Sequence, residues 1–144
     1  MGINALIAAE YGVAVSMVTG DDVLIRETRE ILGNDFVGVI TKYALGRMAA
    51  ITFSPAKVRR MLEDSAGVAV RRAMRGSFRP YRLTKPYRVE FTLRRSYPEM
   101  IVQGVDSLGW QGLEKTGDRS YRLTTSDARQ MGYLLDAIER VVLH

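Results

Sequence analysis

Two aspartates and two cations are the side chains in this chain best suited to chemistry. Asp21 and Asp22 follow a short β-branched run, and Lys42 and Arg47 follow the next apolar run. At the carboxyl end of a strand, an aspartate can reach a substrate amine. A lysine or arginine there can hold a substrate carboxylate or stabilise an oxyanion. Two adjacent carboxylates without further ligands bind metal weakly, so they predict no metal site by themselves.

Each of these residues also has a structural alternative. Asp21 or Asp22 can cap the helix that follows, where a carboxylate also faces the positive end of the helix dipole. Lys42 and Arg47 can be solvated loop charges, or can form ion pairs with the two aspartates. The sequence leaves both alternatives open.

Histidine and cysteine, which supply most catalytic bases and zinc ligands, are almost absent. The chain has no Cys, and its one His is His144. Ser54 has no base to activate it and is expected to be a helix cap. We therefore predict no catalytic residue and no metal ligand in this chain.

The composition is typical of a soluble globular protein. The chain has 144 residues, of which 47% are hydrophobic and 26% charged. No apolar run reaches the roughly 20 residues that a membrane span needs. We therefore expect no membrane insertion and a cytoplasmic location.

Residues 1–76 are predicted to be α/β, with a partial parallel sheet and flanking helices. The expected order is a helix ending near Gly12, a strand over 13–18, a helix from Asp21 or Asp22 to Gly33, a strand over 36–41, an extended piece over 42–53, and a helix from Ser54-Pro55 to about Met74. In the last helix these apolar residues are expected to face inward: Val58, Met61, Leu62, Ala66, Ala69, Val70 and Ala73.

Residues 77–86 are predicted to be a connector, because Gly76, Pro80 and Pro86 punctuate them. Residues 87–144 are predicted to be an α+β subdomain with antiparallel strands. The expected order is an alternating strand over 87–93, a helix started by a Ser96/Glu99 capping box, a hairpin of 113–116 and 120–124 around Gly117-Asp118, and a final helix capped by Ser126 or Asp127. Its expected inward residues are Met131, Leu134, Leu135, Ile138, Val141 and Val142.

The positive charge is concentrated in the middle of the chain. The segment 57–95 holds 12 basic and three acidic residues, whereas the whole chain has a net charge of +5. The alternative to an enzyme is therefore an interaction module that binds nucleic acid or an acidic partner through this segment. We favour a solvated helix face or an oligomer contact instead, because Arg59, Arg60, Arg71, Arg72 and Arg75 occupy the polar face of one helix.

The order of these signals resembles the C-terminal half of the zinc-dependent D-aminopeptidases linked to dipeptide transport, the DppA-like peptidases. That family has a Glu-x-Gly-x-Asn-Ala segment opening a helix, then a Gly-Asp-Asp turn, a strand ending in Lys, and a Ser-Pro-Ala helix start. The matching residues here are Gly2-Ile3-Asn4-Ala5, Gly20-Asp21-Asp22, Lys42, Arg47 and Ser54-Pro55-Ala56, followed by the strand from Tyr87 to Leu93.

The resemblance implies a metal-dependent enzyme that removes N-terminal D-amino acids from short peptides. In that family the zinc ligands and the catalytic His lie in the N-terminal half, and the last ligand is the Glu of the first segment. Met1 stands one position after this Glu, so the chain is expected to lack the metal-binding half and to be inactive alone. Asn4 would orient that Glu, or cap its helix, and the two roles can coexist.

The resemblance also implies the partners. They are zinc in the complete enzyme, the N-terminal half on the same or a separate chain, and further copies in a ring-shaped homo-oligomer. Short D-amino-acid peptides are the implied substrates.

Overall fold

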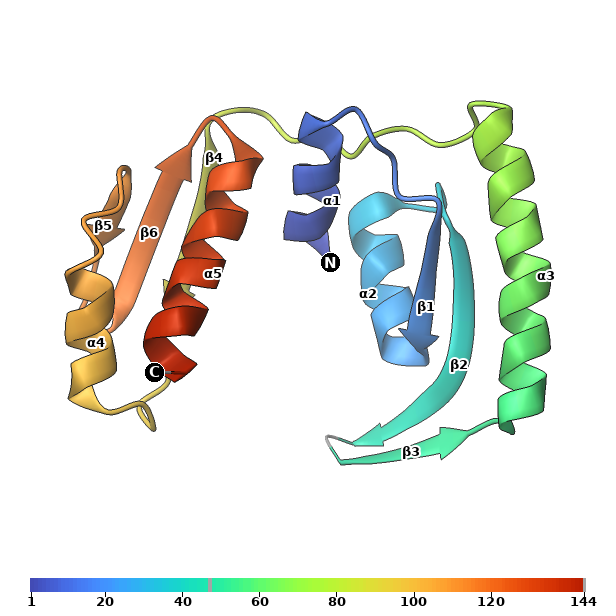
Figure 1. The fold of residues 1–144 in the computed structure, drawn as a ribbon, viewed down its shortest axis with the longest axis horizontal. Coiled ribbons are helices and arrows are strands. Elements are labelled where there is room, and N and C mark those ends of the chain that lie inside the picture. Colours follow the sequence, from blue (N-terminus) through green and yellow to red (C-terminus); the bar gives the residue numbers. More distant parts are fainter. Residues whose placement is uncertain (47, 144) are drawn as a thin grey trace. The chain divides into compact units, whose positions relative to one another are not determined.

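The computed structural model describes residues 1–46 and 48–143, with the side chains of 142 and 143 excepted. The candidate site residue Arg47 and the one histidine, His144, lie outside the described residues. The chain forms two compact units, Met1–Tyr81 and Arg82–His144, whose secondary structure is drawn in Figure 1. The boundary between them falls inside the segment 77–86.

The first unit is a three-stranded sheet with helices. Its elements are α1 (Gly2–Glu10), β1 (Met17–Asp21), α2 (Asp22–Leu32), β2 (Val37–Gly46), β3 (Ala49–Thr52) and α3 (Pro55–Met74). The sheet order is β1-β2-β3, with β1 and β2 parallel, and Figure 1 shows α2 and α3 on opposite sides of it. This confirms the predicted α/β class and its parallel pair of strands.

The first strand lies later in the chain than predicted. It begins at Met17, and Val13 is 56% exposed. The cause is the end of α1, where the Val13 amide still donates to the Ala8 carbonyl at 3.0 Å. Strand pairing between β1 and β2 therefore begins only at Met17, which lies opposite Val37.

The segment 42–53 is a hairpin arm and not a single extended piece. Strand β2 continues to Gly46, and β3 pairs back on it antiparallel, with Lys42 opposite Thr52. The sheet of the first unit is therefore mixed. All four β3 residues are exposed.

Helix α2 fixes the core of the first unit. The buried residues Val18, Ile25 and Phe36 pack together between this helix and the sheet. As predicted, the helix ends at Gly33, whose φ of 66° is a conformation that glycine adopts without steric cost. Helix and both parallel strands therefore share one apolar cluster.

Helix α3 starts as predicted but buries less than predicted. Ser54 is its N-cap and accepts a hydrogen bond from the Lys57 amide, with Pro55 in the first turn. Ala69 is buried and Val58 and Leu62 are half-buried, because the narrow sheet covers only one stripe of the helix. The prediction was wrong for three residues, since Ala66, Val70 and Ala73 are exposed.

The second unit is an antiparallel sheet with two helices. Its elements are β4 (Tyr87–Thr92), α4 (Glu99–Asp106), β5 (Leu113–Lys115), β6 (Ser120–Thr125) and α5 (Ala128–Leu143), and the sheet order is β4-β6-β5. Its core cluster contains Leu93, Ile101, Val102, Val105 and Tyr121. The predicted antiparallel strands and the hairpin around Gly117-Asp118 are confirmed.

Two predictions for the helices of the second unit are wrong. The Ser96/Glu99 capping box is wrong, because Pro98 is the N-cap of α4 and gives no side-chain cap bond. Leu135 is 43% exposed and not inward. Asp127 does cap α5, since its Oδ1 accepts from the Arg129 amide at 2.9 Å. The side chain of Val142 lies outside those described.

Gly112 is a position where a side chain should be poorly tolerated. Its φ is +80°, and a Cβ there would overlap the Thr124 carbonyl oxygen. We expect Gly112→Ala to lower the free energy of unfolding by about 2 kcal/mol or more. The alanine would be destabilised both by the left-handed backbone conformation and by the clash with the Thr124 carbonyl oxygen. Chemical denaturation measures it. Gly109→Ala is the matched control, since Gly109 also has a positive φ but open space around it. Equal losses in the two variants would contradict the clash.

No helix among the described residues is long and apolar enough to cross a membrane.

Candidate functional site at the carboxyl end of the parallel strands

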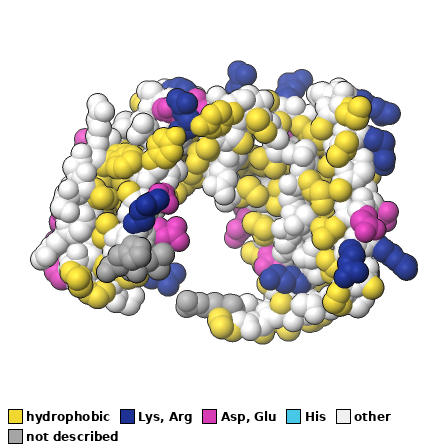
Figure 2. All heavy atoms as spheres, viewed as in Figure 1, with side chains coloured by type: hydrophobic (Ala, Val, Ile, Leu, Met, Phe, Trp, Pro, Cys, Tyr) yellow, Lys and Arg dark blue, Asp and Glu magenta, His cyan; other side chains and the backbone are white. Residues whose placement is uncertain are grey.

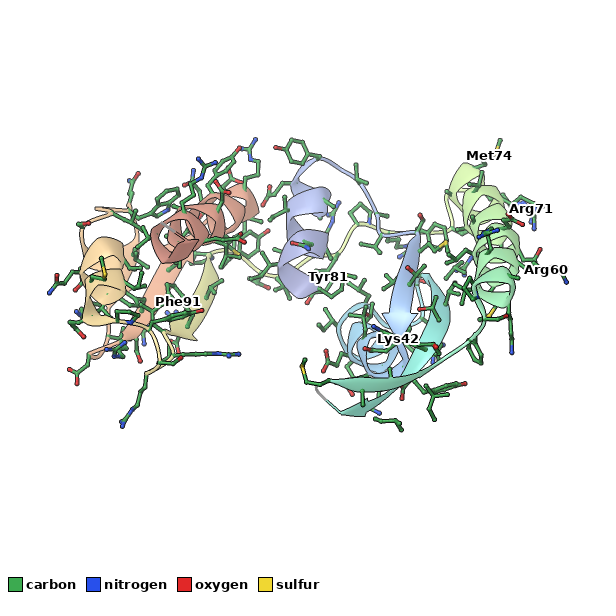
Figure 3. All side chains as sticks on the ribbon, turned by 60° about the horizontal axis from the view of Figure 1, so that its bottom comes forward. Lys42, Arg60, Arg71, Met74, Tyr81 and Phe91 are labelled. Carbon is green, nitrogen blue, oxygen red and sulfur yellow. The ribbon has the colours of Figure 1, made fainter. Side chains whose placement is uncertain are left out.

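Strand pairing brings together two of the elements that carry the predicted site residues. Asp21 ends β1 and lies opposite Lys42 of β2 in the sheet register, next to an irregularity at Gly20/Asp21. Figure 3 labels Lys42 on the β2 strand. Because β1 and β2 are parallel, Asp21, Asp22 and Lys42 lie together where the parallel pairing of these strands ends.

Both aspartates make backbone hydrogen bonds. Asp21 Oδ1 accepts from the Leu24 amide at 2.8 Å, so Asp21 is the N-cap of α2. Asp22 Oδ1 accepts from the Ala44 amide at 2.8 Å and ties the start of α2 to β2. The structural alternative is therefore confirmed for Asp21, and it does not exclude a second role for the remaining oxygen of either carboxylate.

Lys42 does not form the ion pair that the sequence left open. Its side chain is exposed, and its ammonium has no hydrogen-bond or ion-pair partner among residues 1–46 and 48–143. A solvated cation at the end of the parallel pairing is available to an anionic ligand. Its role in binding stays a prediction.

Asn4 lies in the first turn of α1, three residues after the N-cap, and is exposed. The N-cap of this helix is Met1, so the cap alternative for Asn4 is wrong. Its role toward a neighbouring ligand stays a prediction, as does the role of Arg47.

Thr41 also contributes to this site, although it was not among the residues predicted from the sequence. Its Oγ1 donates to the Gly20 carbonyl at 3.1 Å and joins the two strands just before their parallel pairing ends. A threonine at the end of an apolar run is too common to signal such a bond.

A pocket adjoins this end of the sheet. It has a volume of about 500 Å³ and lies between the β2–β3 hairpin and the first turns of α3. Its lining residues are Thr41, Lys42, Thr52, Phe53, Pro55, Val58, Arg59 and Leu62. We call it the hairpin pocket. The Lys57 ammonium lies 4.0 Å from the centre of the Phe53 ring, and the Tyr43 ring meets the Phe53 ring edge-on.

The basic segment 57–95 is divided between the two units. Its part in the first unit runs along α3, where Figure 2 shows cationic side chains interspersed with hydrophobic ones. Figure 3 shows Arg60 and Arg71 on α3, and Arg72 lies over the Phe78 ring at 4.6 Å. No specific feature of α3 favours nucleic-acid binding over a solvated helix face.

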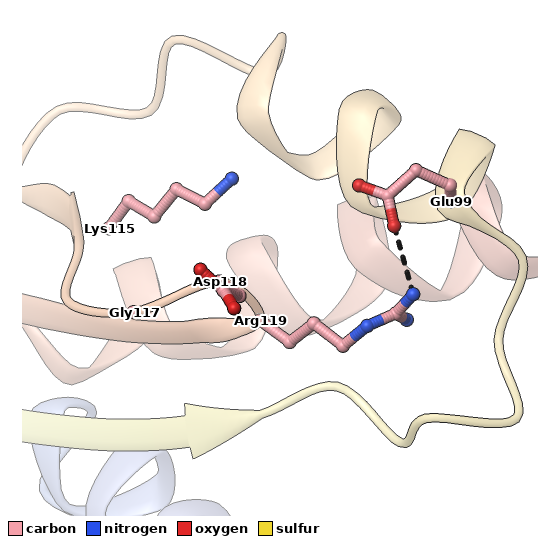
Figure 4. A pocket seen from close by; sticks show the side chains of 5 residues that line it. All are labelled: Glu99, Lys115, Gly117, Asp118 and Arg119. Carbon is pink, nitrogen blue, oxygen red and sulfur yellow. Dashed lines mark hydrogen bonds and ion pairs between the residues drawn. The ribbon is translucent and has the colours of Figure 1, made fainter.

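A second, polar pocket lies in the second unit. Its volume is about 600 Å³, and Figure 4 shows its lining residues Glu99, Lys115, Gly117, Asp118 and Arg119. Arg119 already pairs with Glu99 at 2.9 Å and donates to the Tyr97 carbonyl at 2.9 Å. Lys115 likewise forms an ion pair with Asp106. The two cations of this pocket therefore stabilise the fold and are not free to bind a ligand.

Tyr121 and Asp106 form a hydrogen-bonded pair that Lys115 of this pocket joins. The Tyr121 hydroxyl donates to Asp106 Oδ1 at 2.7 Å, and Lys115 donates to Oδ2 at 2.6 Å. Burial, and then the bond to Asp106, raise the pKa of Tyr121 to about 12. The hydrogen bonds from Lys115 and then from Tyr121 lower the pKa of Asp106.

These pKa shifts predict how stability depends on pH. An unfolded tyrosine ionises near pH 10.0, whereas folded Tyr121 resists ionisation up to about 12, so its stabilisation is complete below pH 10 and is lost as the pH rises toward 12. The stabilisation from Asp106 is present above its usual pKa and is lost as the pH falls through the lowered value. Unfolding midpoints across the pH range test this. Tyr121→Phe should lose less stability than the unmodified chain above pH 10, and parallel curves would contradict the assignment.

No zinc site forms from the described part of the chain alone. Within it, no three His, Cys, Asp or Glu side chains are grouped closely enough to hold a metal ion. The residues present therefore do not fit a complete zinc site.

Comparison with known proteins identifies the family. A family model described as D-aminopeptidase matches residues 1–137. The chain belongs to the D-aminopeptidase family. A D-aminopeptidase of Bacillus subtilis (strain 168) is 36% identical over 70 residues, which cover 49% of this chain and 25% of that protein.

The fold of this D-aminopeptidase family member is shared with a solved structure. The structure is that of DppA, a zinc-dependent D-aminopeptidase from Bacillus subtilis described as a self-compartmentalizing protease. The TM-score is 0.81 at 23% identity, and the match covers 99% of this chain and 50% of that one. At this identity the likeness shows the fold alone. The chain thus spans about half of the solved relative and a quarter of the curated one.

Proposed function

We propose that this chain forms the substrate-side part of a zinc-dependent D-aminopeptidase that removes N-terminal D-residues from short peptides. Membership of the D-aminopeptidase family supports the reaction, and the zinc dependence stated for DppA supports the metal. The metal would be held mainly by residues outside this chain, in the part of the relatives that the chain does not match. Alone, the chain would be inactive.

The position of Lys42 is the main observation in favour of substrate binding by this chain. Lys42 stands at the carboxyl end of the parallel pairing between β1 and β2, where open α/β folds bind ligands. Its ammonium is unpaired among the described residues, while the nearby aspartates are held by backbone amides. We propose that Lys42 and Arg47 hold the substrate carboxylate and that Asp21 and Asp22 shape the same end of the site. Asn4 would orient a neighbouring metal ligand.

The edge of β1 supports the proposed partner. In the described residues β1 pairs with β2 only, so its other edge carries unpaired backbone groups. We propose that strands of the metal-binding half add at this edge and that the joined protein forms a homo-oligomer. The self-compartmentalizing assembly stated for DppA supports the second step. A cytoplasmic location remains part of this proposal.

The isolated chain should bind zinc no better than an exposed carboxylate surface. Its described residues offer no cluster of metal-binding side chains, and zinc sites in proteins use mainly His and Cys. Calorimetric titration with zinc at neutral pH is the measurement. A one-to-one site of micromolar affinity or better would show that the ligands lie in this chain.

Reconstitution tests the proposed activity. The chain is co-expressed with the N-terminal half of a close relative, and release of the first residue from short peptides is followed with zinc present. We expect hydrolysis of peptides that begin with a D-residue only when both parts are present. A matched control replaces the N-terminal half by one whose metal-binding His residues are changed to Ala.

A further inference from the structure

We infer that the hairpin pocket binds the carboxyl-terminal residue of a peptide, taking both its carboxylate and an apolar side chain. The inference rests on the proposed function and names its substrate class: short peptides that end in an apolar residue with a free carboxylate. Two properties of the pocket carry it, the apolar surface of its walls and the sign of its charges.

The walls of the pocket present apolar surface that the fold itself does not cover. Phe53, Val58 and Leu62 line it and are each only half-buried. Pro55 adds a further apolar wall from the first turn of α3. The volume of about 500 Å³ lies within the range of small-molecule sites, which runs from roughly 300 to 1,000 Å³. An aliphatic or aromatic side chain would cover this surface and gain the free energy of apolar burial.

The charges of the pocket have one sign. Lys42 and Arg59 are its charged lining residues, and none of the described residues that line it is acidic. Neither cation has a hydrogen-bond or ion-pair partner within residues 1–46 and 48–143. Lys57, held over the Phe53 ring, places a third positive charge beside the same wall. The positive end of the 20-residue helix α3 faces this region too.

A ligand that satisfies both properties has an apolar body and one anionic group. A phosphate-rich polymer would satisfy the cations but would leave the apolar walls exposed to water. An uncharged apolar molecule would leave two unpaired cations beside it. The free carboxylate and apolar side chain of a peptide's last residue meet both requirements, and a bidentate contact with the Arg59 guanidinium is available to such a carboxylate.

The probe is N-acetyl-leucine, compared with N-acetyl-leucinamide and N-acetyl-glycine. Each is titrated into the full ¹⁵N-labelled chain, and amide shifts of Thr52, Phe53 and Val58 are followed by NMR. We expect N-acetyl-leucine to bind about tenfold more tightly than the amide, which lacks the charge, because one charge-assisted contact is worth about 1.4 kcal/mol. N-acetyl-glycine should also bind more weakly, since it lacks the apolar side chain.

Two variants locate the binding. Arg59→Gln should weaken N-acetyl-leucine by about tenfold. Arg60→Gln, the next residue on α3 with the same charge but outside the pocket lining, should leave its affinity unchanged. Val58→Thr keeps the side-chain shape and should reduce the preference for leucine over glycine. Equal affinity for acid and amide, or equal losses in the Arg59 and Arg60 variants, would overturn the inference by showing diffuse charge attraction.

The binding measurement is independent of the proposed activity, because it needs neither zinc nor the metal-binding half. An active reconstituted enzyme without binding at the hairpin pocket overturns this inference and leaves the proposed function standing. Binding here with an inactive reconstituted enzyme overturns the proposed function, and with it the peptide as the natural ligand.

Discussion

Replacing Lys42 with alanine in the reconstituted enzyme is expected to lower kcat/KM for short D-peptides by about tenfold to a hundredfold. The physical reason is the loss of a charge-assisted contact to the substrate carboxylate, worth roughly 1.4 to 3 kcal/mol. Lys42 stands where the parallel pairing of β1 with β2 ends, and its ammonium has no partner in the described part of the chain that would compete. Arg47→Ala is expected to act in the same direction. Steady-state kinetics on the reconstituted enzyme measure both effects.

Controls separate this contact from a general loss of positive charge. Arg72→Ala removes a cation of α3 that lies over the Phe78 ring and does not line the hairpin pocket. It should reduce kcat/KM less than either Lys42→Ala or Arg47→Ala. Lys42→Arg keeps the charge and should recover part of the activity. If Arg72→Ala costs as much as Lys42→Ala, the assignment of Lys42 to the substrate carboxylate is wrong.

Tyr121→Ala is expected to remove most of the stability of the second unit. Tyr121 is 2% exposed, belongs to the core cluster with Val102 and Val105, and stacks on Phe91 with ring centres 5.3 Å apart. Removing a buried aromatic side chain leaves a cavity and costs about 3–5 kcal/mol. Hydrogen exchange of the amides in β4, β6 and α5 measures this loss, and residues of β1 and α2 serve as the internal reference.

Two further variants divide that loss into its parts. Tyr121→Phe keeps the ring and removes the hydroxyl that donates to Asp106, so it should cost only about 1 kcal/mol. Tyr133→Ala removes a tyrosine of α5 that is 55% exposed and should cost little. Comparable losses for Tyr121→Ala and Tyr133→Ala would show that the Tyr121 ring is not central to this core.

The sequence was most informative where a local rule has one physical solution. Asp21, the Ser54-Pro55 pair and Gly33 mark helix ends because caps, proline and positive-φ glycine each suit one helix position. The alternation from Tyr87 onward gave an antiparallel strand, because one face of such a strand is buried and the other is wet. The α/β class of the first unit and the family resemblance followed from the order of these signals.

Tertiary context decided the features that the sequence did not predict. Nothing local shows that β2 continues past Lys42 and that β3 folds back on it, since the hairpin depends on pairing between the two strands. Val70 is apolar at a helical spacing, yet it is exposed because the sheet beneath α3 has only three strands. Ser96 and Glu99 have capping-box spacing, but Pro98 takes the cap and Glu99 pairs with Arg119 from a distant hairpin.

The candidate residues of the site could be predicted from their type and their order in the chain. Their hydrogen-bond and ion-pair partners could not. Lys42 was equally compatible with an ion pair to Asp21 or Asp22 and with a free ammonium. The structure decides this, because both carboxylates accept backbone amides and Lys42 is left without a partner in the described residues. The hairpin pocket depends on Phe53 and Leu62 lining one hollow between the hairpin and α3, and spacing alone could not show that.

The rate of D-residue release by the reconstituted pair tests the central claim most directly. The chain, the N-terminal half of a relative, and the two together are each assayed with zinc on peptides that begin with a D-residue and on their L-counterparts. The proposal predicts release only from the D-peptides and only when both parts are present, with the two parts co-purifying as one zinc-containing assembly. A stable chain that neither associates with the metal-binding half nor gives activity with it would contradict the account.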